Sequence, residues 1–161
     1  MSPINKVLDS VSQKQSAIIS FRRAMVFDRA FLLALRKESM DKHLHSAGIY
    51  LDDNSHLSRI DEFFSDSHII LYQKNAIGLL KLGLFPDKIH LRQFQLLPKY
   101  QGLGIGSRVL ELVKRKAQEK KLAITLNVLL KNPAKQLYLR HDFVVIDSNE
   151  LEFQMYWHWR E

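Results

Sequence analysis

Glycines at positions 102, 104 and 106 separate an apolar run that ends at Leu97 from an amphipathic run that starts at Ser107. The first run has the pattern of a β-strand and the second that of an α-helix. Glycine lets backbone N–H groups turn outward without a clash at Cβ, and a helix start adds unpaired amides and a partial positive charge. The stretch therefore predicts a strand–loop–helix unit that binds phosphate oxygens.

Two familiar phosphate loops do not fit this stretch. The dinucleotide fingerprint G-x-G-x-x-G fails because Ser107 stands where its last glycine should be, and the following strand at 122–128 supplies no acidic residue. The Walker loop fails because no Gly-Lys-Ser/Thr follows. What remains is Gln-x-x-Gly-x-Gly at a strand-to-helix junction, beginning at Gln101.

The pattern from Gln101 resembles the pyrophosphate loop of the GCN5-related N-acetyltransferase (GNAT) family. A second block at residues 126–143, with Asn-Pro-Ala from Asn132 and Leu-Tyr ending at Tyr138, resembles that family's other signature in the same order and spacing. One departure is visible, because Asp142 stands where the family usually has a glycine. Aspartate adopts a positive φ at some cost, so the resemblance still predicts the family's fold.

Hydrophobic periodicity predicts a polar lead-in at 1–16 and a single mixed α/β domain at 17–161. Strands are expected at 17–21, 68–74, 77–84, 88–97, 122–130, 143–146 and from 151 to about 159. Helices are expected from 27 to 47, with a kink or a break near 37–39, from a cap at Asn54 or Ser55 to 64, and at 107–120 and 133–140. This order matches the family's acyl-CoA N-acyltransferase fold, a mostly antiparallel central sheet with a splayed parallel strand pair and about four flanking helices.

The amino-acid composition excludes several classes of protein and of active site. The chain has 161 residues, 46% of them hydrophobic, which suits one domain. It has no run of 18 apolar residues and no signal-peptide pattern at its start, so we expect a soluble, cytoplasmic protein without a membrane partner. Without cysteine the chain has no disulfide, no thiolate zinc site and no cysteine acyl-enzyme. The histidines lack HExxH or other metal spacing, so we expect no metal.

The net charge of +7 does not by itself indicate a nucleic-acid partner. The basic residues are spread along the chain, and the densest group, at 114–116 and 120–121, falls late in one expected helix, where cations complement the helix dipole. No helix-turn-helix, zinc or RRM-type signature accompanies them. The positive field also helps to attract a polyanionic cofactor.

By resemblance, the cofactor is acetyl-CoA, and the main chain near the end of the strand at 88–97 holds its pantetheine while the loop amides hold its pyrophosphate. The residues that the resemblance assigns to it are Leu96, Leu97, Gln101, Gly102, Leu103, Gly104, Ile105, Gly106, Ser107, Arg108 and Asn132. Three of them have a second interpretation. Gln101 shapes the loop, Arg108 either reaches a phosphate or is an exposed structural arginine, and Asn132 either bonds the cofactor arm or only caps a helix.

Acetyl transfer needs a neutral amine and a proton donor for the departing thiolate. An alkyl ammonium with a pKa of about 10.4 is rarely neutral at pH 7, so a base matters. The resemblance assigns that base to His90, six residues before Leu96, and strand alternation would place His90, Arg92, Phe94 and Leu96 on one face. The resemblance assigns the proton donor to Tyr138. The alternatives are a half-exposed strand histidine and a packed helix aromatic.

The sequence leads to the hypothesis of an N-acetyltransferase that moves acetyl from acetyl-CoA to a primary amine of a small molecule or peptide within a ternary complex. The alternative is a non-catalytic acyl-CoA-binding or sensor module of the same fold. Carboxylates in the segments that line the family's acceptor pocket either hold a cationic amine or are solvated helix ends: Glu38, Asp52, Asp53, Asp61 and Glu62, with Tyr50 beside them. Phe153, Trp157 and Trp159 belong either to the core or to a homodimer seam.

Overall fold

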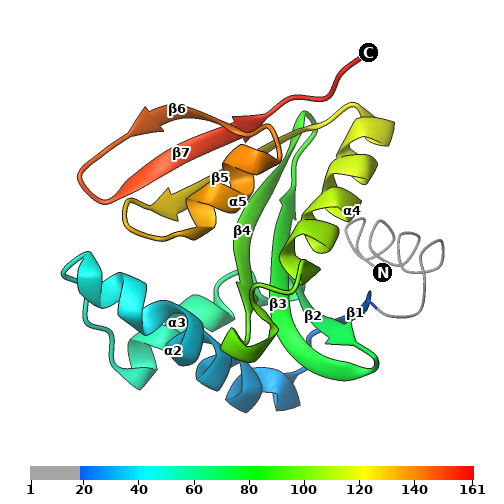
Figure 1. Cartoon of the computed structure of the whole chain (residues 1–161). Helices are drawn as coiled ribbons and strands as arrows, with labels where there is room; N and C mark the ends of the chain where they lie inside the picture. Colours follow the sequence, from blue (N-terminus) through cyan, green and yellow to red (C-terminus); the bar gives the residue numbers. More distant parts are fainter. Residues whose placement is uncertain (1–18) are drawn as a thin grey trace.

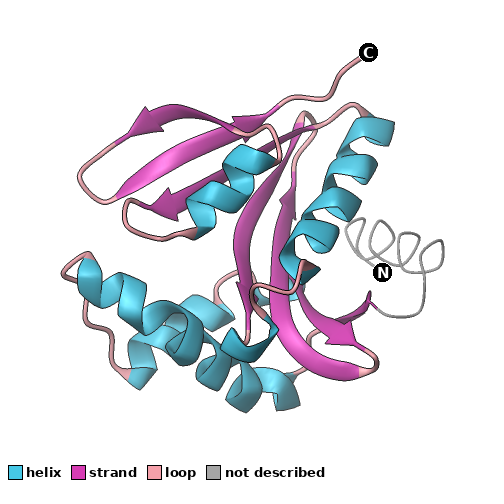
Figure 2. Ribbon diagram, in the orientation of Figure 1, coloured by secondary structure: helices cyan, strands magenta, loops and turns pink. Residues whose placement is uncertain are grey.

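The strands of the chain form one mixed sheet in the order β1-β2-β3-β4-β5-β7-β6 (Figures 1 and 2). The computed structural model describes residues 19–161. The strands are β1 (Ile19–Arg23), β2 (Ser67–Tyr72), β3 (Asn75–Leu84), β4 (Lys88–Leu96), β5 (Ala123–Leu129), β6 (Val144–Ser148) and β7 (Glu152–Trp157). All neighbours pair antiparallel except β4 and β5, which run parallel. The predicted mixed fold is confirmed, and the predicted lead-in at 1–16 lies outside the described residues.

Four helices accompany the sheet in the described part of the chain: α2 (Arg29–Ser46), α3 (Asp53–Asp61), α4 (Ile105–Lys120) and α5 (Ala134–Arg140). Short 3₁₀ turns precede α2, β2 and α4, namely η1 (Val26–Asp28), η2 (Phe64–Asp66) and η3 (Pro98–Tyr100). None of the helices within residues 19–161 is both long and apolar enough to cross a bilayer.

Two expectations about the early helices are wrong. Helix α2 runs from Arg29 to Ser46 as one element, so the expected division into two short helices is wrong, and the change in apolar phase accompanies a change of neighbours. Its first half buries Leu32 and Leu35 in the core, whereas Met40 in its second half lines a cavity. The N-cap of α3 is Asp52, whose carboxylate accepts the backbone N–H of Ser55 at 2.8 Å, so neither Asn54 nor Ser55 is the cap.

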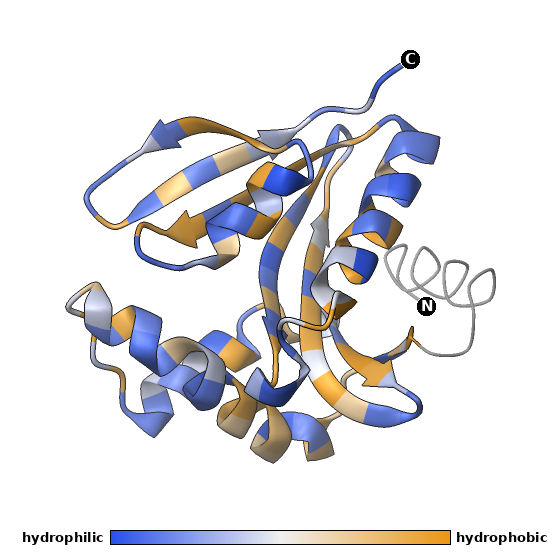
Figure 3. Ribbon diagram, viewed as in Figure 1, coloured by the Kyte–Doolittle hydropathy of each residue, from blue (hydrophilic) through white to orange (hydrophobic). Residues whose placement is uncertain are grey.

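Apolar clusters cover both faces of the sheet, and apolar and polar residues alternate along β4 and β7 (Figure 3). Leu79 and its neighbour Leu80 on β3 belong to different clusters, so the two clusters lie on opposite faces. One cluster joins Leu79 to buried leucines of α2 and to Ile60 of α3. The other joins Leu80 to the buried face of α4, which includes Val109. The sheet is therefore covered by α2 and α3 on one face and by α4 on the other.

A β-bulge interrupts β4. Its register with β3 pairs Lys81 with Gln93 and Leu82 with Leu91, so Arg92 is an extra residue. Leu91 and Phe94 consequently pack in the same cluster, although three positions separate them. The expectation that His90 and Arg92 share a face with Phe94 and Leu96 is wrong, because the bulge resets the alternation between the two pairs.

The parallel pair parts before its strands end. Strands β4 and β5 are paired from Lys88 and Ala123 to Leu91 and Leu126, while β4 continues to Leu96. Beyond this point β4 stays paired with β3 and β5 stays paired with β7. The splayed parallel pair that the resemblance implied is therefore present, and it leaves one edge of each strand open.

The aromatic residues of the last strand are part of the core. Trp157 is buried in the cluster that contains α4, and Phe153 and Trp159 pack against that cluster. The alternation along the strand therefore serves internal packing, and a homodimer stays a prediction.

Candidate active site

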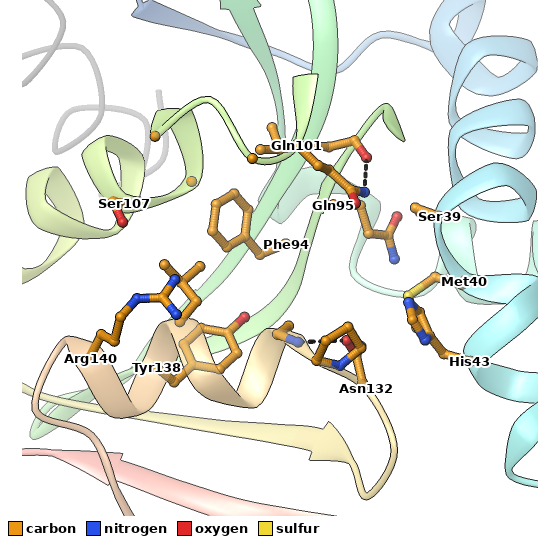
Figure 4. Close-up of a pocket in the computed structure, with 17 residues that line it drawn as sticks. Ser39, Met40, His43, Phe94, Gln95, Gln101, Ser107, Asn132, Tyr138 and Arg140 are labelled. Atoms are coloured by element: carbon orange, nitrogen blue, oxygen red, sulfur yellow. Dashed lines mark hydrogen bonds between the residues drawn. The ribbon is translucent and has the colours of Figure 1, made fainter. Parts of the chain in front are cut away.

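A cavity of about 420 Å³ lies where β4 and β5 part (Figure 4). It is bounded by β4, the glycine loop and the start of α4, the segment that leads into and includes α5, and the middle of α2. The residues that line it are Ser39, Met40, His43, Phe94, Gln95, Leu96, Gln101, Gly102, Gly104, Gly106, Ser107, Asn132, Pro133, Ala134, Leu137, Tyr138 and Arg140. The structure thus brings most of the predicted site residues to one place.

The glycine loop takes the conformation that its composition predicts. Gly102 and Gly104 have φ of +73° and +81°, a region that residues with a side chain rarely adopt. Gly104 is the residue before α4, and the N–H of Arg108 already donates to its carbonyl oxygen at 3.1 Å. The first amides of α4 have no partner within the helix, and they begin at the cavity wall. This end of the cavity therefore suits an anion.

Gln101 and the two leucines connect this loop to β4. The side-chain amide of Gln101 donates to the carbonyl oxygen of Leu96 at 2.9 Å, so this side chain shapes the loop as expected. The N–H of Leu97 is used by the carbonyl oxygen of Ile77 on β3, at 2.8 Å. Because successive peptide groups point to opposite sides of a strand, the peptide N–H of Leu96 faces the side that β5 leaves open.

The remaining predicted loop residues have different surroundings. Leu103 is exposed, while Ile105, the first residue of α4, is buried in the core. Arg108 does not line the cavity but a second hollow of about 230 Å³, beside Arg115.

Ser107 has a partner that the sequence did not indicate. Its hydroxyl lies 3.1 Å from Nε2 of His141, and Nδ1 of the same ring lies 2.7 Å from the Glu111 carboxylate. The contact connects the end of α5 to the first turns of α4. The only available signal was that Ser107 and Glu111 are four residues apart and so share a helix face.

The ring of Tyr138 is packed against the core, whereas its hydroxyl faces the cavity. Its ring contacts Phe143 edge to face with 5.6 Å between centroids, and the residue is only 5% exposed. The hydroxyl points into the cavity (Figure 4). Burial raises the pKa of Tyr138 well above the ordinary tyrosine value, so the phenol keeps its proton at neutral pH. Asp142 has a φ of +67°, the conformation expected where the family has glycine.

Asn132 has a structural contact and also faces the cavity. Its side-chain oxygen accepts the N–H of Ala134 at 2.9 Å and so satisfies the first amide of α5, although Pro133 is the N-cap residue. This bond occupies only the oxygen, so the amide nitrogen is left for another partner. The two interpretations of Asn132 are compatible.

His90 lies apart from the cavity lining. Its Nδ1 is 2.8 Å from the hydroxyl of Thr125 on β5, and the β4 bulge separates its face from that of Phe94. Burial lowers the pKa of His90, and the charges of Arg92 and Lys88 lower it further. The ring is therefore neutral at neutral pH, which is the form that accepts a proton.

Three of the carboxylates suggested for the acceptor have contacts with other residues. Asp52 caps α3, Asp53 pairs with Lys37 at 2.9 Å, and Asp61 pairs with Arg29 at 2.9 Å. No Asp or Glu is among the described residues that line the cavity. The cavity lining includes instead Gln95 and, from α2, Ser39, Met40 and His43, which sequence reasoning missed because contacts between distant segments leave no local pattern.

Comparisons with known proteins agree with this geometry. A sequence model described as "Acetyltransferase (GNAT) domain" matches residues 50–159. PaiA N-acetyltransferase from Thermoplasma acidophilum, solved in complex with coenzyme A, is 22% identical and superposes with a TM-score of 0.66 over 88% of this chain and 99% of that one. An acetyltransferase from Thermus thermophilus is 16% identical, with a TM-score of 0.71 over 88% and 97%.

A third similar structure is Arabidopsis thaliana Naa50 in complex with the bisubstrate analogue CoA-Ac-MVNAL. It is 15% identical and superposes with a TM-score of 0.65 over 88% of this chain and 99% of that one. None of the curated proteins matches this sequence. At these identities the superpositions establish the fold, and the sequence model establishes the family.

Proposed function

Because the chain belongs to the GNAT acetyltransferase family, we propose that it transfers the acetyl group of acetyl-CoA to a primary amine of a small molecule or peptide, directly within a ternary complex. The observation that carries the proposal is the shared cavity of the glycine loop, the open edge of β4 and the Tyr138 hydroxyl. An anion site, a main-chain edge and a proton donor in one hollow are what a phosphate-bearing thioester requires.

Acetyl-CoA fits the cavity because several N–H groups in its walls are not used by hydrogen bonds within the protein. The amides at the start of α4 suit the pyrophosphate, and the N–H of Leu96 and the amide nitrogen of Asn132 suit the pantetheine arm. The thioester supplies an activated acetyl group. Arg108 lies on another hollow, so its part in binding a phosphate stays a prediction.

The protein contributes to the reaction by donating a proton to the leaving group and accepting one from the amine. When the amine attacks the thioester carbon, a C–N bond forms and the C–S bond breaks, which leaves a thiolate and a protonated nitrogen. Tyr138 gives its proton to the thiolate, since its phenol is protonated at neutral pH and points into the cavity. His90 takes the proton of the amine through a chain of water, because its ring lies outside the cavity lining.

A non-catalytic acyl-CoA-binding module is the second candidate. The observation in its favour is the separation of His90 from the cavity, so the base that the resemblance assigns is not among the residues that line it. The retained, cavity-facing Tyr138 favours the enzyme.

The distinguishing experiment measures thiol release from acetyl-CoA with a broad panel of amines. We expect release above the rate of spontaneous hydrolysis with at least one primary amine, together with an acetylated product by mass spectrometry. Tight acetyl-CoA binding without thiol release for any amine would favour the binding module.

A further inference from the structure

The cavity has two unlike walls. One contains the glycine loop and Tyr138, which the proposed function uses. The other is formed by Ser39, Met40 and His43 of α2, with Gln95 of β4 opposite them (Figure 4). This second wall, here called the α2 wall, has no part in binding the acyl donor as described above.

Gln95 of the α2 wall carries an unsatisfied polar atom. The residue is 6% exposed, and its side-chain oxygen is fully buried without a hydrogen-bond partner in the described part of the chain. A buried amide without a partner is destabilising, and most proteins avoid it. In this orientation the oxygen is shielded, so a ligand in the cavity can supply the missing hydrogen bond only after the amide turns over.

Ser39 determines which end of the Gln95 amide is available. The Ser39 hydroxyl donates to the carbonyl oxygen of Leu35 at 2.6 Å, so its oxygen can only accept from another group. The amide of Gln95 lies beside Ser39 (Figure 4). A half-turn of that amide directs its NH₂ toward Ser39 and turns its oxygen toward the cavity, and the two orientations have nearly the same shape.

The charges around the cavity exclude a polycation as the preferred acceptor. The residues of the lining include Arg140 and His43 but no carboxylate. Two acids of α2 and α3 are already paired, Asp41 with His56 at 2.8 Å and Asp53 with Lys37 at 2.9 Å. A second or third ammonium group entering this cavity would therefore lose its hydration without gaining a counter-ion.

We propose that the α2 wall binds an acceptor whose amine lies next to a neutral amide, as at the start of a peptide, and that Gln95 selects it by hydrogen bonding to that amide. The inference rests on the proposed function and adds the class of acceptor. An amide complements Gln95 because each group has one acceptor and at least one donor. The aliphatic part of the acceptor contacts Met40.

The test compares alanyl-alanine amide with spermidine as acceptors for the full chain and two variants. Gln95→Leu removes the amide at nearly constant volume. Gln93→Leu is the matched control, because Gln93 lies two positions earlier on β4, also has a buried oxygen without a partner, and does not line the cavity.

We expect the unaltered protein to prefer the dipeptide amide in kcat/KM. Gln95→Leu should lower kcat/KM for it about tenfold, mainly through KM, the range of one hydrogen bond to a neutral group. Affinity for acetyl-CoA should not fall, because the α2 wall has no part in binding the acyl donor. Gln93→Leu should leave both acceptors unchanged.

The inference fails if Gln95→Leu and Gln93→Leu behave alike, or if spermidine is the better acceptor. Calorimetric binding of the dipeptide amide in the presence of coenzyme A gives a second readout without turnover, and it should be weakened only by Gln95→Leu. Because that titration needs no acetyl transfer, loss of acceptor selection is distinguishable from absence of catalysis, which would instead remove the proposed function.

Discussion

The side-chain amide of Gln101 donates a hydrogen bond to the backbone carbonyl oxygen of Leu96, with 2.9 Å between nitrogen and oxygen. This bond spans the 3₁₀ turn η3 and joins the first residue of the glycine loop to the last residue of β4. It fixes the start of α4 relative to the open strand edge, the two parts of the cavity that the proposed function assigns to one ligand.

Replacement of Gln101 by alanine should loosen this connection. The Leu96 carbonyl would lose its partner, so we expect a loss of about 1 kcal/mol in unfolding free energy and several-fold weaker acetyl-CoA binding. Leu103→Ala is the control, since Leu103 is exposed in the same loop and its side chain has no assigned contact. Equal affinities of the two variants, measured by calorimetry, would contradict the assignment.

Alanine substitutions at two glycines of the loop should affect different properties, one the melting temperature and the other the affinity for acetyl-CoA. Gly104 has a φ of +81° and open space around it, so Gly104→Ala meets no clash but incurs backbone strain of about 1 kcal/mol. Gly106 has no positive φ, and an added Cβ would lie 3.5 Å from Leu137, an ordinary contact. Gly106→Ala should therefore keep the melting temperature while obstructing the cavity that Gly106 lines.

Thermal melts and acetyl-CoA titrations on both variants check this contrast. Gly104→Ala should melt lower by about 2–4 °C, the shift expected for about 1 kcal/mol in a domain of this size. Gly106→Ala should melt unchanged and bind acetyl-CoA more weakly. The opposite pattern would show that the loop conformation seen here is not the one that binds.

Tyr138→Phe removes only the cavity-facing hydroxyl and keeps the edge-to-face contact with Phe143. If the phenol protonates the departing thiolate, kcat should fall by about 10²-fold or more, the usual range for a general acid, while acetyl-CoA affinity stays within about twofold. Steady-state kinetics with a calorimetric titration measure both quantities. Unchanged kcat would remove Tyr138 from the mechanism.

The pH dependence of turnover tests His90. Burial and the charges of Arg92 and Lys88 lower its pKa, so the neutral base persists to lower pH than for an ordinary histidine. We expect turnover to fall only below about pH 6.5, and His90→Gln to lower the rate and abolish that acidic limb. His158→Gln is the control, because His158 is exposed near the chain end. A limb that survives in His90→Gln would assign it to another group.

The titration of His90 should also change how the unfolding free energy depends on pH. Where the native pKa is lowered, the unfolded chain binds more protons than the native state, so unfolding free energy rises with pH through the range from the native to the unfolded pKa. Chemical unfolding at several pH values should therefore show a smaller rise between the native pKa and about 6.5 in His90→Gln than in the unaltered protein.

Local patterns in the sequence predicted most of the fold. Strand alternation, the glycine loop and the amphipathic α4 each depend on neighbours within a few residues, and the structure has all of them. The β4 bulge escaped prediction because the extra residue, Arg92, is identified only by its pairing with β3. That single insertion changes the face on which Phe94 lies relative to His90.

The site residues, like the elements of the fold, were predicted where they belong to a continuous motif and were missed where they meet only through packing. Tyr138 and most of the loop residues follow from motifs that are continuous in sequence, and they meet in the cavity. Gln95 and the α2 residues opposite it are more than fifty positions apart, and their approach depends on how α2 packs on the sheet. The contacts of Asp53 and Asp61 with basic residues of α2 likewise appear only in three dimensions.

The most direct test is calorimetric titration of the folded protein with acetyl-CoA. We expect a saturable isotherm with one site per chain, a dissociation constant below about 1 mM, and weaker binding in Gly106→Ala. Absence of heat up to millimolar acetyl-CoA, in a sample whose thermal melt shows a cooperative fold, would contradict the assignment of the glycine loop and the cavity beside it to an acyl-CoA thioester.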